Sequence, residues 1–300
     1  TDGTATLMTG IPVAIKDNIL VSGRRVGAAS KILEGYVATY SGAAIQKLQT
    51  AGVVFMGRTN MDEFAMGSST ENSAYGPTKN PYDTSRVPGG SSGGAAAAIA
   101  MEGALVSLGS DTAGSVRQPA GFCGCVGLKT TYGTISRSGL IALGSSLDQI
   151  GPVTKTVEDS EIVFNTIRGQ DPLDSTTLTE EIYDKARSDG AKKVMTVGVP
   201  RNLIDGEGID EDVRMNFEDS IERLKKLGYV VKDINLPHVK YSLPTYYIML
   251  PGEASSNLAR FDGMKYGLYM SGDRLIDDYL LSRGNGFGPE PRRRILLGTY

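Results

Sequence analysis

Residues 86–132 read RVPGGSSGGAAAAIAMEGALVSLGSDTAGSVRQPAGFCGCVGLKTTY and contain two glycine-rich loops, each with a serine. Glycine has no Cβ, so the loop at residues 88–94 can turn sharply and present backbone N–H groups to a ligand. Residues 95–100 predict a tightly packed helix directly after this loop. A strand-like segment, residues 104–108, leads into the second loop, residues 110–115. The pattern predicts two serines and a group of backbone donors that converge.

The glycine–serine run permits three interpretations. A bare run of this kind is typical of a flexible linker. Here apolar segments flank the run, and a second glycine–serine loop follows the next strand. A phosphate-binding P-loop ends in Gly-Lys-Ser/Thr, and neither loop does. We therefore favour a serine nucleophile beside an oxyanion-binding loop.

A serine hydroxyl needs a partner that accepts its proton, and this partner is usually histidine. The only histidine, His238, lies far along the chain in a loop context, and we do not favour it as the base. Lys16 ends a strand-like apolar segment at residues 10–18, where burial would lower the pKa of its ammonium. A lysine that ends a strand is ordinarily solvated, but serine–lysine pairs are an established alternative to the histidine triad.

These segments together resemble the amidase signature family. The family combines GGSSGG with D-x-G-G-S-x-R-x-P-A-x-x-x-G and an upstream G-x-P-x-x-x-K-D, and all three are present here. Lys16 and Ser91 are 75 residues apart, and Ser91 and Ser115 are 24 apart, as in the family. The resemblance implies an α/β amidase-signature fold, with a mixed β-sheet core flanked by helices. It also implies that Ser115 is the acyl-forming nucleophile, Ser91 the bridging serine and Lys16 the base.

The resemblance further implies a cis peptide bond between Gly90 and Ser91 and an oxyanion hole formed by the backbone of Thr112, Ala113 and Gly114. The family usually has glycine where this chain has Ala113. Alanine would strain the loop at a positive φ, so we expect φ of Ala113 to be negative.

Two segments of the core, residues 61–72 and 145–152, are more particular than a general amidase requires, and residues 244–248 and 253–263 continue the match downstream. They resemble the glutamine-hydrolysing subunits of tRNA-dependent amidotransferases. That resemblance implies L-glutamine as the substrate, B and C partner subunits, and contact with tRNA only through the B subunit. It implies no cofactor in this subunit, with ATP and Mg²⁺ expected on the partner.

A glutamine pocket needs a cation for the α-carboxylate, because an unpaired buried charge is costly. The resemblance implies Arg294 for this role, with Arg293 left open as the alternative, and Tyr246 as a pocket-lining residue. A solvated basic start of a helix is the alternative interpretation of residues 292–294. The aspartate that would bind the α-ammonium is expected beyond residue 300.

Two rival functions share part of this pattern. A stand-alone amidase acting on small or aromatic carboxamides would use the same lysine and serines, although residues 253–263 argue against it. A non-catalytic scaffold subunit would keep the fold, although retention of all three catalytic residues argues against that role.

The 300 residues are 40% hydrophobic and 22% charged, with a net charge of −3, which argues against nucleic-acid binding by surface charge alone. Cys123 and Cys125 are spaced poorly for zinc, and a disulfide between them would be strained, so we expect free thiols and no metal. No signal peptide, membrane span or polybasic anchor is evident, which favours the cytoplasm or an organelle matrix.

Residues 1–170 are expected to form the amidase signature core with the catalytic triad. Residues 171–300 are expected to form the second part of the α/β amidase domain, with pocket-lining and partner-facing elements; both ends resemble those of a fragment. We expect a helix at residues 41–49 capped by Ser41, a buried strand at residues 53–56 and a helix beginning at Thr156. Residues 194–199, 212–227 and 229–234 predict a strand–helix–strand unit, after a polar, turn-rich stretch at 170–189.

Overall fold

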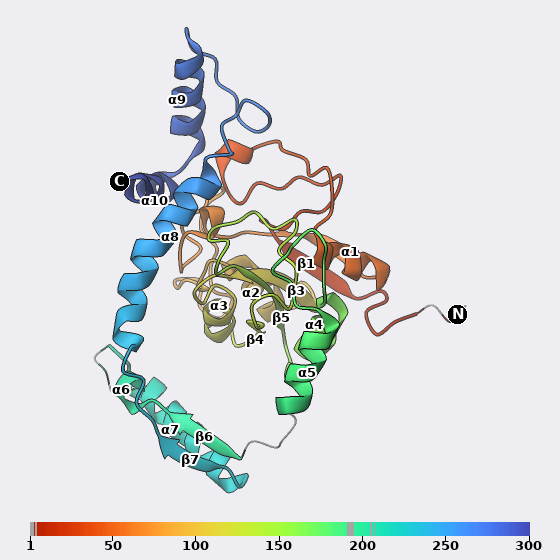
Figure 1. Cartoon of the computed structure of the whole chain (residues 1–300), viewed down its shortest axis with the longest axis vertical. Helices are drawn as coiled ribbons and strands as arrows, with labels where there is room; N and C mark the ends of the chain where they lie inside the picture. The colour runs from red at the N-terminus through yellow and green to blue at the C-terminus, as the bar shows by residue number, and fades with distance from the viewer. Residues whose placement is uncertain (1–2, 4, 191–194, 205, 207) are drawn as a thin grey trace. The chain divides into compact units, whose positions relative to one another are not determined.

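The structure, a computed structural model, describes residues 3, 5–190, 195–204, 206 and 208–300. The chain forms two compact units: Thr1–Glu180 with Ile248–Tyr300, and Glu181–Tyr247 (Figure 1). The boundary expected at residue 170 separates two parts of the chain by their roles, not by compactness. It stays a prediction.

Unit 1 is built on a five-stranded mixed sheet in the order β2-β1-β3-β5-β4. β1 pairs in parallel with both β2 and β3, whereas β5 pairs antiparallel with β3 and β4. The expected α/β fold with a mixed sheet flanked by helices is confirmed. The strands are β1 (Pro12–Lys16), β2 (Val54–Thr59), β3 (Val106–Asp111), β4 (Val126–Gly127) and β5 (Gln149–Thr154).

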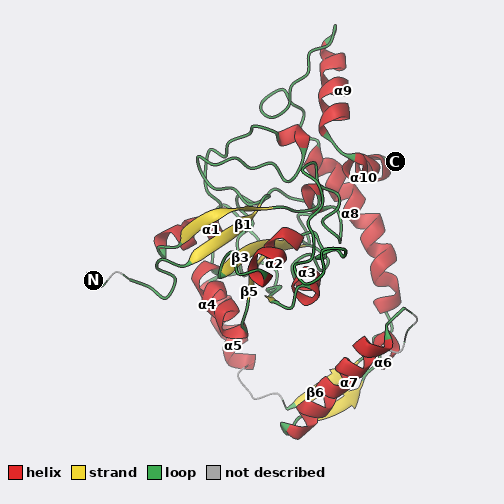
Figure 2. Ribbon diagram, turned by 180° about the vertical axis from the view of Figure 1, so that it is seen from behind, coloured by secondary structure: helices red, strands yellow, loops and turns green. Residues whose placement is uncertain are grey.

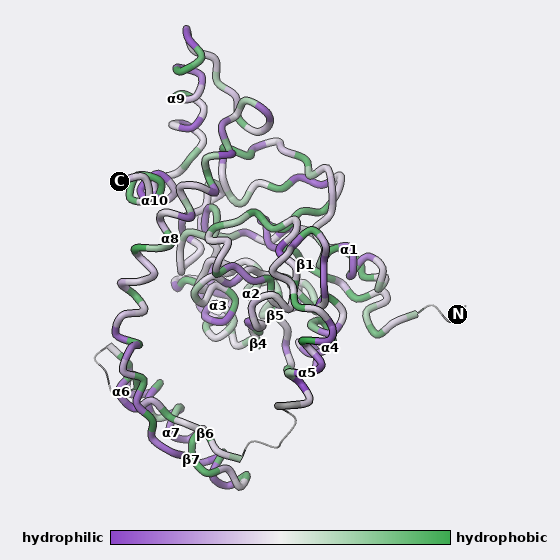
Figure 3. The backbone as a smooth tube through the Cα atoms, in the orientation of Figure 1, coloured by the Kyte–Doolittle hydropathy of each residue, from purple (hydrophilic) through white to green (hydrophobic). Residues whose placement is uncertain are grey.

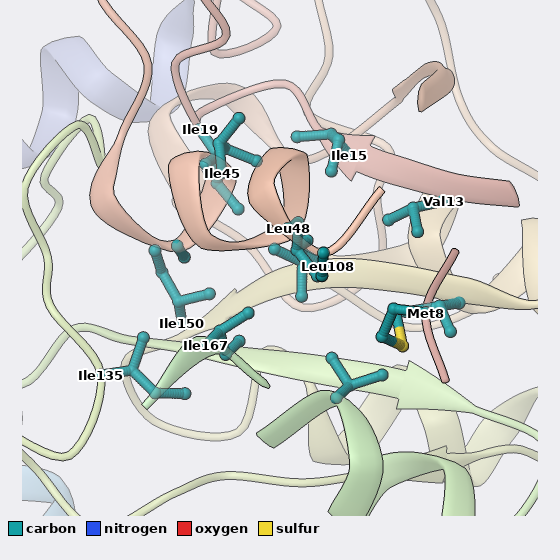
Figure 4. Close-up of a cluster of buried hydrophobic side chains, with 14 of the residues drawn as sticks. Met8, Val13, Ile15, Ile19, Ile45, Leu48, Leu108, Ile135, Ile150 and Ile167 are labelled. Carbon is teal, nitrogen blue, oxygen red and sulfur yellow. The ribbon is translucent and has the colours of Figure 1, made fainter. Parts of the chain in front are cut away.

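Helices pack on both faces of this sheet (Figure 2). Large aliphatic residues of α1 (Ala43–Thr50) and α4 (Val157–Ile167) cover one face and form the cluster drawn in Figure 4. Mostly alanines and other small residues of α2 (Gly93–Ala100), with α3 (Arg117–Phe122), cover the other.

Side chains of a strand alternate between its two faces, and β1 shows what this alternation achieves. Val13 and Ile15 belong to the aliphatic cluster, whereas Ala14 belongs to the small-residue cluster under α2. Lys16 follows with the parity of Ala14. Its side chain therefore reaches the glycine–serine loop that begins α2.

The rest of unit 1 surrounds these layers. It comprises η1 (Lys31–Leu33), η2 (Glu63–Ala65), most of α8 (Ser242–Leu258), α9 (Leu275–Gly286) and α10 (Pro289–Thr299). The ring of Phe64 in η2 lies 5.1 Å from that of Phe261 and 5.6 Å from that of Phe287, measured between centroids. These buried rings attach the C-terminal helices to the segment that follows β2.

Unit 2 contains the predicted strand–helix–strand motif. Its elements are nearly all of α5 (Glu180–Gly190), β6 (Thr196–Val199), α6 (Arg201–Ile204), α7 (Glu211–Lys226), β7 (Val230–Asp233), η3 (Val239–Tyr241) and the first residues of α8. β6 and β7 pair in parallel. Hydrophilic and hydrophobic positions alternate along α7 (Figure 3), and Ile221 is its buried residue. The first predicted residue of the motif, Val194, lies outside the described residues.

Two local predictions were wrong, and a third was right only for the first half of its stretch. The N-cap of α1 is Gly42, because the Ser41 hydroxyl accepts a hydrogen bond from Ser22 N instead. The strand expected to be buried is the outer strand β2, where Val54 and Met56 are 50% and 58% exposed. The stretch at residues 170–189 contains most of α5 and is not turn-rich throughout.

Thr156 caps α4 as predicted: its hydroxyl accepts from Asp159 N at 3.1 Å. Because the cap satisfies a backbone donor that would otherwise lack an intrahelical partner, Thr156→Ala should lower the free energy of unfolding by about 1 kcal/mol, measured by urea denaturation. Thr50→Ala at the exposed end of α1, where the hydroxyl only bonds Gln46 O, is the control and should cost about 0.5 kcal/mol or less. Equal losses in the two variants would contradict the cap assignment.

Candidate active site

Lys16, the last residue of β1, is fully buried (0% exposed). Its Nζ donates to Ser91 Oγ at 2.7 Å and to Ser92 Oγ at 2.8 Å. It also lies 3.0 Å from Ser110 Oγ and 3.2 Å from Ser110 O, and Asn18 Nδ2 donates to the same hydroxyl at 2.9 Å. The lysine is therefore not a solvated end of a strand. It is in direct contact with the serine expected to bridge the proton relay.

Burial lowers the pKa of the Lys16 ammonium from 10.5 to about 7. Desolvation is the largest cause, because a charged amine is poorly stabilised away from water. The carboxylates of Asp62, Asp148 and Asp111 act in the opposite direction and keep the pKa from falling further. Lys16 is thus balanced between its charged and neutral forms at neutral pH, as a general base requires.

The loop that begins α2 is fixed in place and is not a flexible linker. Ser91 is completely buried, and the peptide bond between Gly90 and Ser91 is cis, as expected. A Cβ on Gly90 would lie 2.2 Å from Asp62 Oδ2, and one on Gly94 would lie 2.4 Å from Asn60 O. Only glycine permits the neighbouring segments to approach the serine this closely.

Ser115 lies in the loop between β3 and α3 and is 8% exposed. Ser92 N donates to Ser115 O at 3.1 Å, which ties the two serine loops together. The carboxylate of Asp111 shapes the loop by accepting from Gly114 N at 2.7 Å and from Val116 N at 3.1 Å. The loop residue with positive φ is Gly114 (136°) and not Ala113, so the expectation for Ala113 is confirmed.

Asp111 also pairs with Arg117, whose Nε and Nη2 donate at 3.0 and 2.9 Å. Burial alone would raise the pKa of Asp111, but the hydrogen bonds from Arg117 and the loop amides outweigh it and hold the pKa below its usual value. This carboxylate stays charged and keeps the turn of the nucleophile loop closed.

The oxyanion hole expected at Thr112, Ala113 and Gly114 stays a prediction. Two of these residues make different contacts in the structure. The Gly114 amide donates to Asp111, so in this conformation it is directed to that carboxylate. Thr112 Oγ1 donates to Asp148 Oδ1 at 2.7 Å. Asp148 also accepts from the backbone N–H groups of Leu143 and Gly144, and burial raises its pKa. The Thr112 end of the loop is therefore anchored to the turn before β5.

Sequence reasoning missed four residues of this cluster: Asn18, Ser92, Ser110 and Asp111. Ser92 and Asp111 were visible in the motifs, where each stands next to or near a serine of interest. Ser110 and Asn18 gave no comparable signal, because their importance depends on the parallel pairing of β1 with β3. That pairing brings Lys16 and Ser110 together across 94 residues of sequence.

The two candidate substrate-binding arginines lie in α10 and differ in exposure. Arg294 is buried, whereas the Arg293 side chain is about half exposed. Both pair with Glu290: Arg294 Nε with Oε1 at 2.7 Å, and Arg293 Nη2 with Oε1 at 2.6 Å. A buried guanidinium next to a carboxylate is no solvated end of a helix, so the alternative for Arg294 is wrong. Its role toward substrate stays a prediction.

The remaining predicted residues lie outside the lysine–serine cluster. Tyr246 belongs to unit 2, where its ring packs edge-on against Tyr247 with centroids 5.3 Å apart, and its pocket role stays a prediction. His238, also in unit 2, stacks on Tyr241. Cys123 and Cys125 are free thiols, as expected, and burial raises the pKa of Cys123 to about 11.

In the described part of the chain, no three His, Cys, Asp or Glu side chains are grouped so that they could hold a metal ion. None of its helices combines the length and apolar character needed to span a membrane.

The buried lysine, the serine loops and the mixed sheet define a class of protein. An amidase family model matches residues 2–300, and the chain belongs to this family. Among curated relatives, it is 53% identical to the A subunit of glutamyl-tRNA(Gln) amidotransferase from Microcystis aeruginosa over 98% of its own length. Identity to the protein of the same name from Methylacidiphilum infernorum is 54%, over 97% of this chain. The chain spans 61% and 59% of these two relatives.

Solved structures agree with this assignment of family and fold. The glutamyl-tRNA(Gln) amidotransferase A subunit from Thermotoga maritima superposes with a TM-score of 0.76 at 36% identity, covering 96% of this chain and 75% of that one. Peptide amidase from Stenotrophomonas maltophilia superposes with a TM-score of 0.80 at 30% identity, covering 97% and 61%.

The pKa of Lys16 predicts a pH dependence for the reactivity of Ser115. Only neutral Lys16 accepts a proton, so the rate of acylation by a neutral serine-directed probe should rise from acid to alkaline pH with a midpoint near 7. Mass spectrometry of the modified serine after timed exposure measures this rate.

Asp62→Asn removes the largest Coulombic stabilisation of the Lys16 ammonium and should move that midpoint to lower pH. The matched control, Asp83→Asn, changes an exposed carboxylate paired with Arg86 and should leave the midpoint in place. A midpoint that Asp62→Asn raises would exclude this electrostatic account.

Proposed function

We propose that this chain hydrolyses L-glutamine and supplies ammonia to a tRNA-dependent amidotransferase. The observation that carries the proposal is the buried contact of 2.7 Å between Lys16 Nζ and Ser91 Oγ, in a lysine whose pKa is lowered to about 7. The identity of 53% to glutamyl-tRNA(Gln) amidotransferase A subunits, compared with 30% to the peptide amidase, supports glutamine over other carboxamides.

The first chemical step transfers the acyl group. Neutral Lys16 accepts the proton of Ser91, Ser91 accepts that of Ser115, and Ser115 Oγ attacks the side-chain amide carbon of glutamine. Backbone N–H groups of the Ser115 loop stabilise the negative oxygen of the tetrahedral intermediate, and the Gly114 N–H joins them only after it releases Asp111 Oδ1. When the C–N bond breaks, the relay returns its proton to the leaving nitrogen, and ammonia departs.

The second step restores the enzyme. Water loses a proton to the same relay and attacks the ester carbon on Ser115; the bond to Ser115 Oγ breaks, glutamate departs, and the relay returns the proton to Oγ. In each step the relay first takes a proton from the attacking group and then gives it to the leaving group. It must therefore transfer protons in both directions. A Lys16 pKa near neutrality permits both transfers with little energetic bias.

Recognition of glutamine is assigned to Arg294 and Tyr246. Arg294 binds the α-carboxylate, and Arg293 is the alternative cation. The guanidinium of Arg294 already pairs with Glu290, which holds its position and limits the cost of burying its charge.

The similarity to amidotransferase A subunits supports a place for the chain in a larger assembly. B and C subunits are the proposed partners, and the ammonia is consumed on the B subunit in the conversion of Glu-tRNA(Gln) to Gln-tRNA(Gln). ATP and Mg²⁺ belong to that partner, and tRNA contacts this chain only through it. We place the assembly in the cytoplasm, or in an organelle matrix in a eukaryote.

A stand-alone amidase is the second candidate, since peptide amidase gives a TM-score of 0.80. Such an enzyme would use the same lysine and serines but would not require a pocket for the glutamine α-carboxylate. Hydrolysis of propionamide in preference to L-glutamine would favour it.

Release of ammonia from L-glutamine by the full-length protein, with and without its partner subunits, tests the proposal. Removing the nucleophile in Ser115→Ala should lower the rate at least about 1,000-fold. Ser220→Ala, at an exposed position of α7, is the matched control and should retain wild-type turnover. Glutamine turnover that persists in Ser115→Ala would rule out the proposed nucleophile.

A further inference from the structure

Asp62, the first of two consecutive buried acidic residues that follow β2, contacts the Ser91 loop. Asp62 N donates to Ser91 O at 3.2 Å. Its carboxylate accepts from Thr70 N at 2.9 Å and from Asn72 N at 3.1 Å, and it lies against Gly90, where a Cβ would come within 2.2 Å of Oδ2. This residue is therefore part of the wall that fixes the bridging serine.

Glu63, the next residue, contacts the C-terminal helices. It is 4% exposed, and both of its carboxylate oxygens accept from Gly288 N at 3.1 Å. Ser30 Oγ donates to Glu63 Oε1 and lies 3.2 Å from Gly286 O. A Cβ on Gly288 would fall 2.1 Å from Glu63 Oε2, so the carboxylate occupies the space that a side chain at residue 288 would need.

The N-cap residue of α10 makes no side-chain capping bond of its own. Gly288 is the N-cap residue and provides no capping side chain, and Pro289 and Pro291 have no N–H to donate. A carboxylate at a helix N-terminus is also favoured by the helix dipole. Glu63 therefore serves α10 as a cap contributed from 225 residues away in the sequence.

Phe64 reinforces this attachment. Its φ of 51° is unusual for a large side chain and orients a buried ring against Phe261 and Phe287. Three consecutive residues thus join the serine loop to the helix that contains Arg294.

We propose that Glu63 is a positioning residue for glutamine: by fixing the N-terminus of α10 to the segment behind Ser91, it sets the position of Arg294 relative to the reacting serine. This inference rests on the proposed function, in which Arg294 binds the α-carboxylate. It assigns Glu63 no contact with substrate or with the reacting atoms.

Steady-state glutaminase kinetics of the full-length protein with its partner subunits test the proposal. Glu63→Gln leaves one oxygen for Gly288 N and places an amide nitrogen where the second was, so KM for L-glutamine should rise at least about fivefold while kcat changes less than about twofold. Acylation of Ser115 by a small probe without an α-carboxylate should be unchanged, which also shows that the variant is folded.

Four further variants complete the experiment. Glu71→Gln is the matched control: it makes the same change at an exposed residue lining the same cavity, of about 420 Å³, and should leave KM unchanged. Glu63→Asp keeps the charge and should restore part of the affinity. Glu63→Gln combined with Arg294→Lys should raise KM no further than Arg294→Lys alone, because both act on one recognition step.

The possible failures are distinguishable. If the wild-type protein releases no ammonia from L-glutamine, the proposed function fails, and this inference with it. If Arg294→Lys raises KM but Glu63→Gln does not, only the positioning role is overturned. The same holds if Glu63→Gln lowers kcat and probe acylation in parallel without changing KM, since that is the signature of a general structural role.

Discussion

The burial of one ammonium group is the constraint on which the rest of this structure depends. Moving a charged amine out of water is costly, and the protein offsets that cost with hydroxyl oxygens in hydrogen-bonding contact and with aspartates at longer range. The result is a lysine with a pKa of about 7, which is neither a permanent cation nor an inert amine. All three aspartates have a structural task as well: Asp111 closes the nucleophile loop, Asp148 anchors its Thr112 end, and Asp62 lies against the Ser91 loop. Charge balance and loop geometry are therefore maintained by the same groups.

The site also requires backbone segments to approach one another closely. Parallel pairing of β1 with β3 places Lys16 next to β3. For Lys16 to contact Ser91 and Ser92, the start of α2 must also lie directly against these two strands. A Cβ on Gly109 in β3 would lie 2.9 Å from Ser92 Oγ, and glycine at that position makes the necessary space. Glycines in this region thus act as spacers between rigid elements, the opposite of their role in a linker.

Much of the core of the site could be predicted from the sequence, because motif and spacing specify Lys16 and Ser91, and the side chains do meet. The mixed sheet was likewise predictable from the family resemblance. Other features were not, for physical reasons. The exposure of β2 depends on its place at the edge of the sheet, which local hydrophobicity does not encode. The contact between Glu63 and Gly288 joins residues that are 225 apart in the sequence. Nothing in a lone glutamate or glycine predicts a partner that far along the chain.

The alternation along β1 divides the sheet into two faces with different packing materials, branched aliphatics under α1 and α4 and mostly small residues under α2. Substitutions on the aliphatic face alter cavity volume far from the serines, and one side chain can compensate for another. The face under α2 is packed more closely: Ala95 and Ala96 are completely buried, and a Cβ on Gly94 in the same helix would lie against Asn60 O. A volume change on the small-residue face acts directly on the helix that begins at the Ser91 loop, whereas the aliphatic face packs against α1 and α4, which contain none of the catalytic residues.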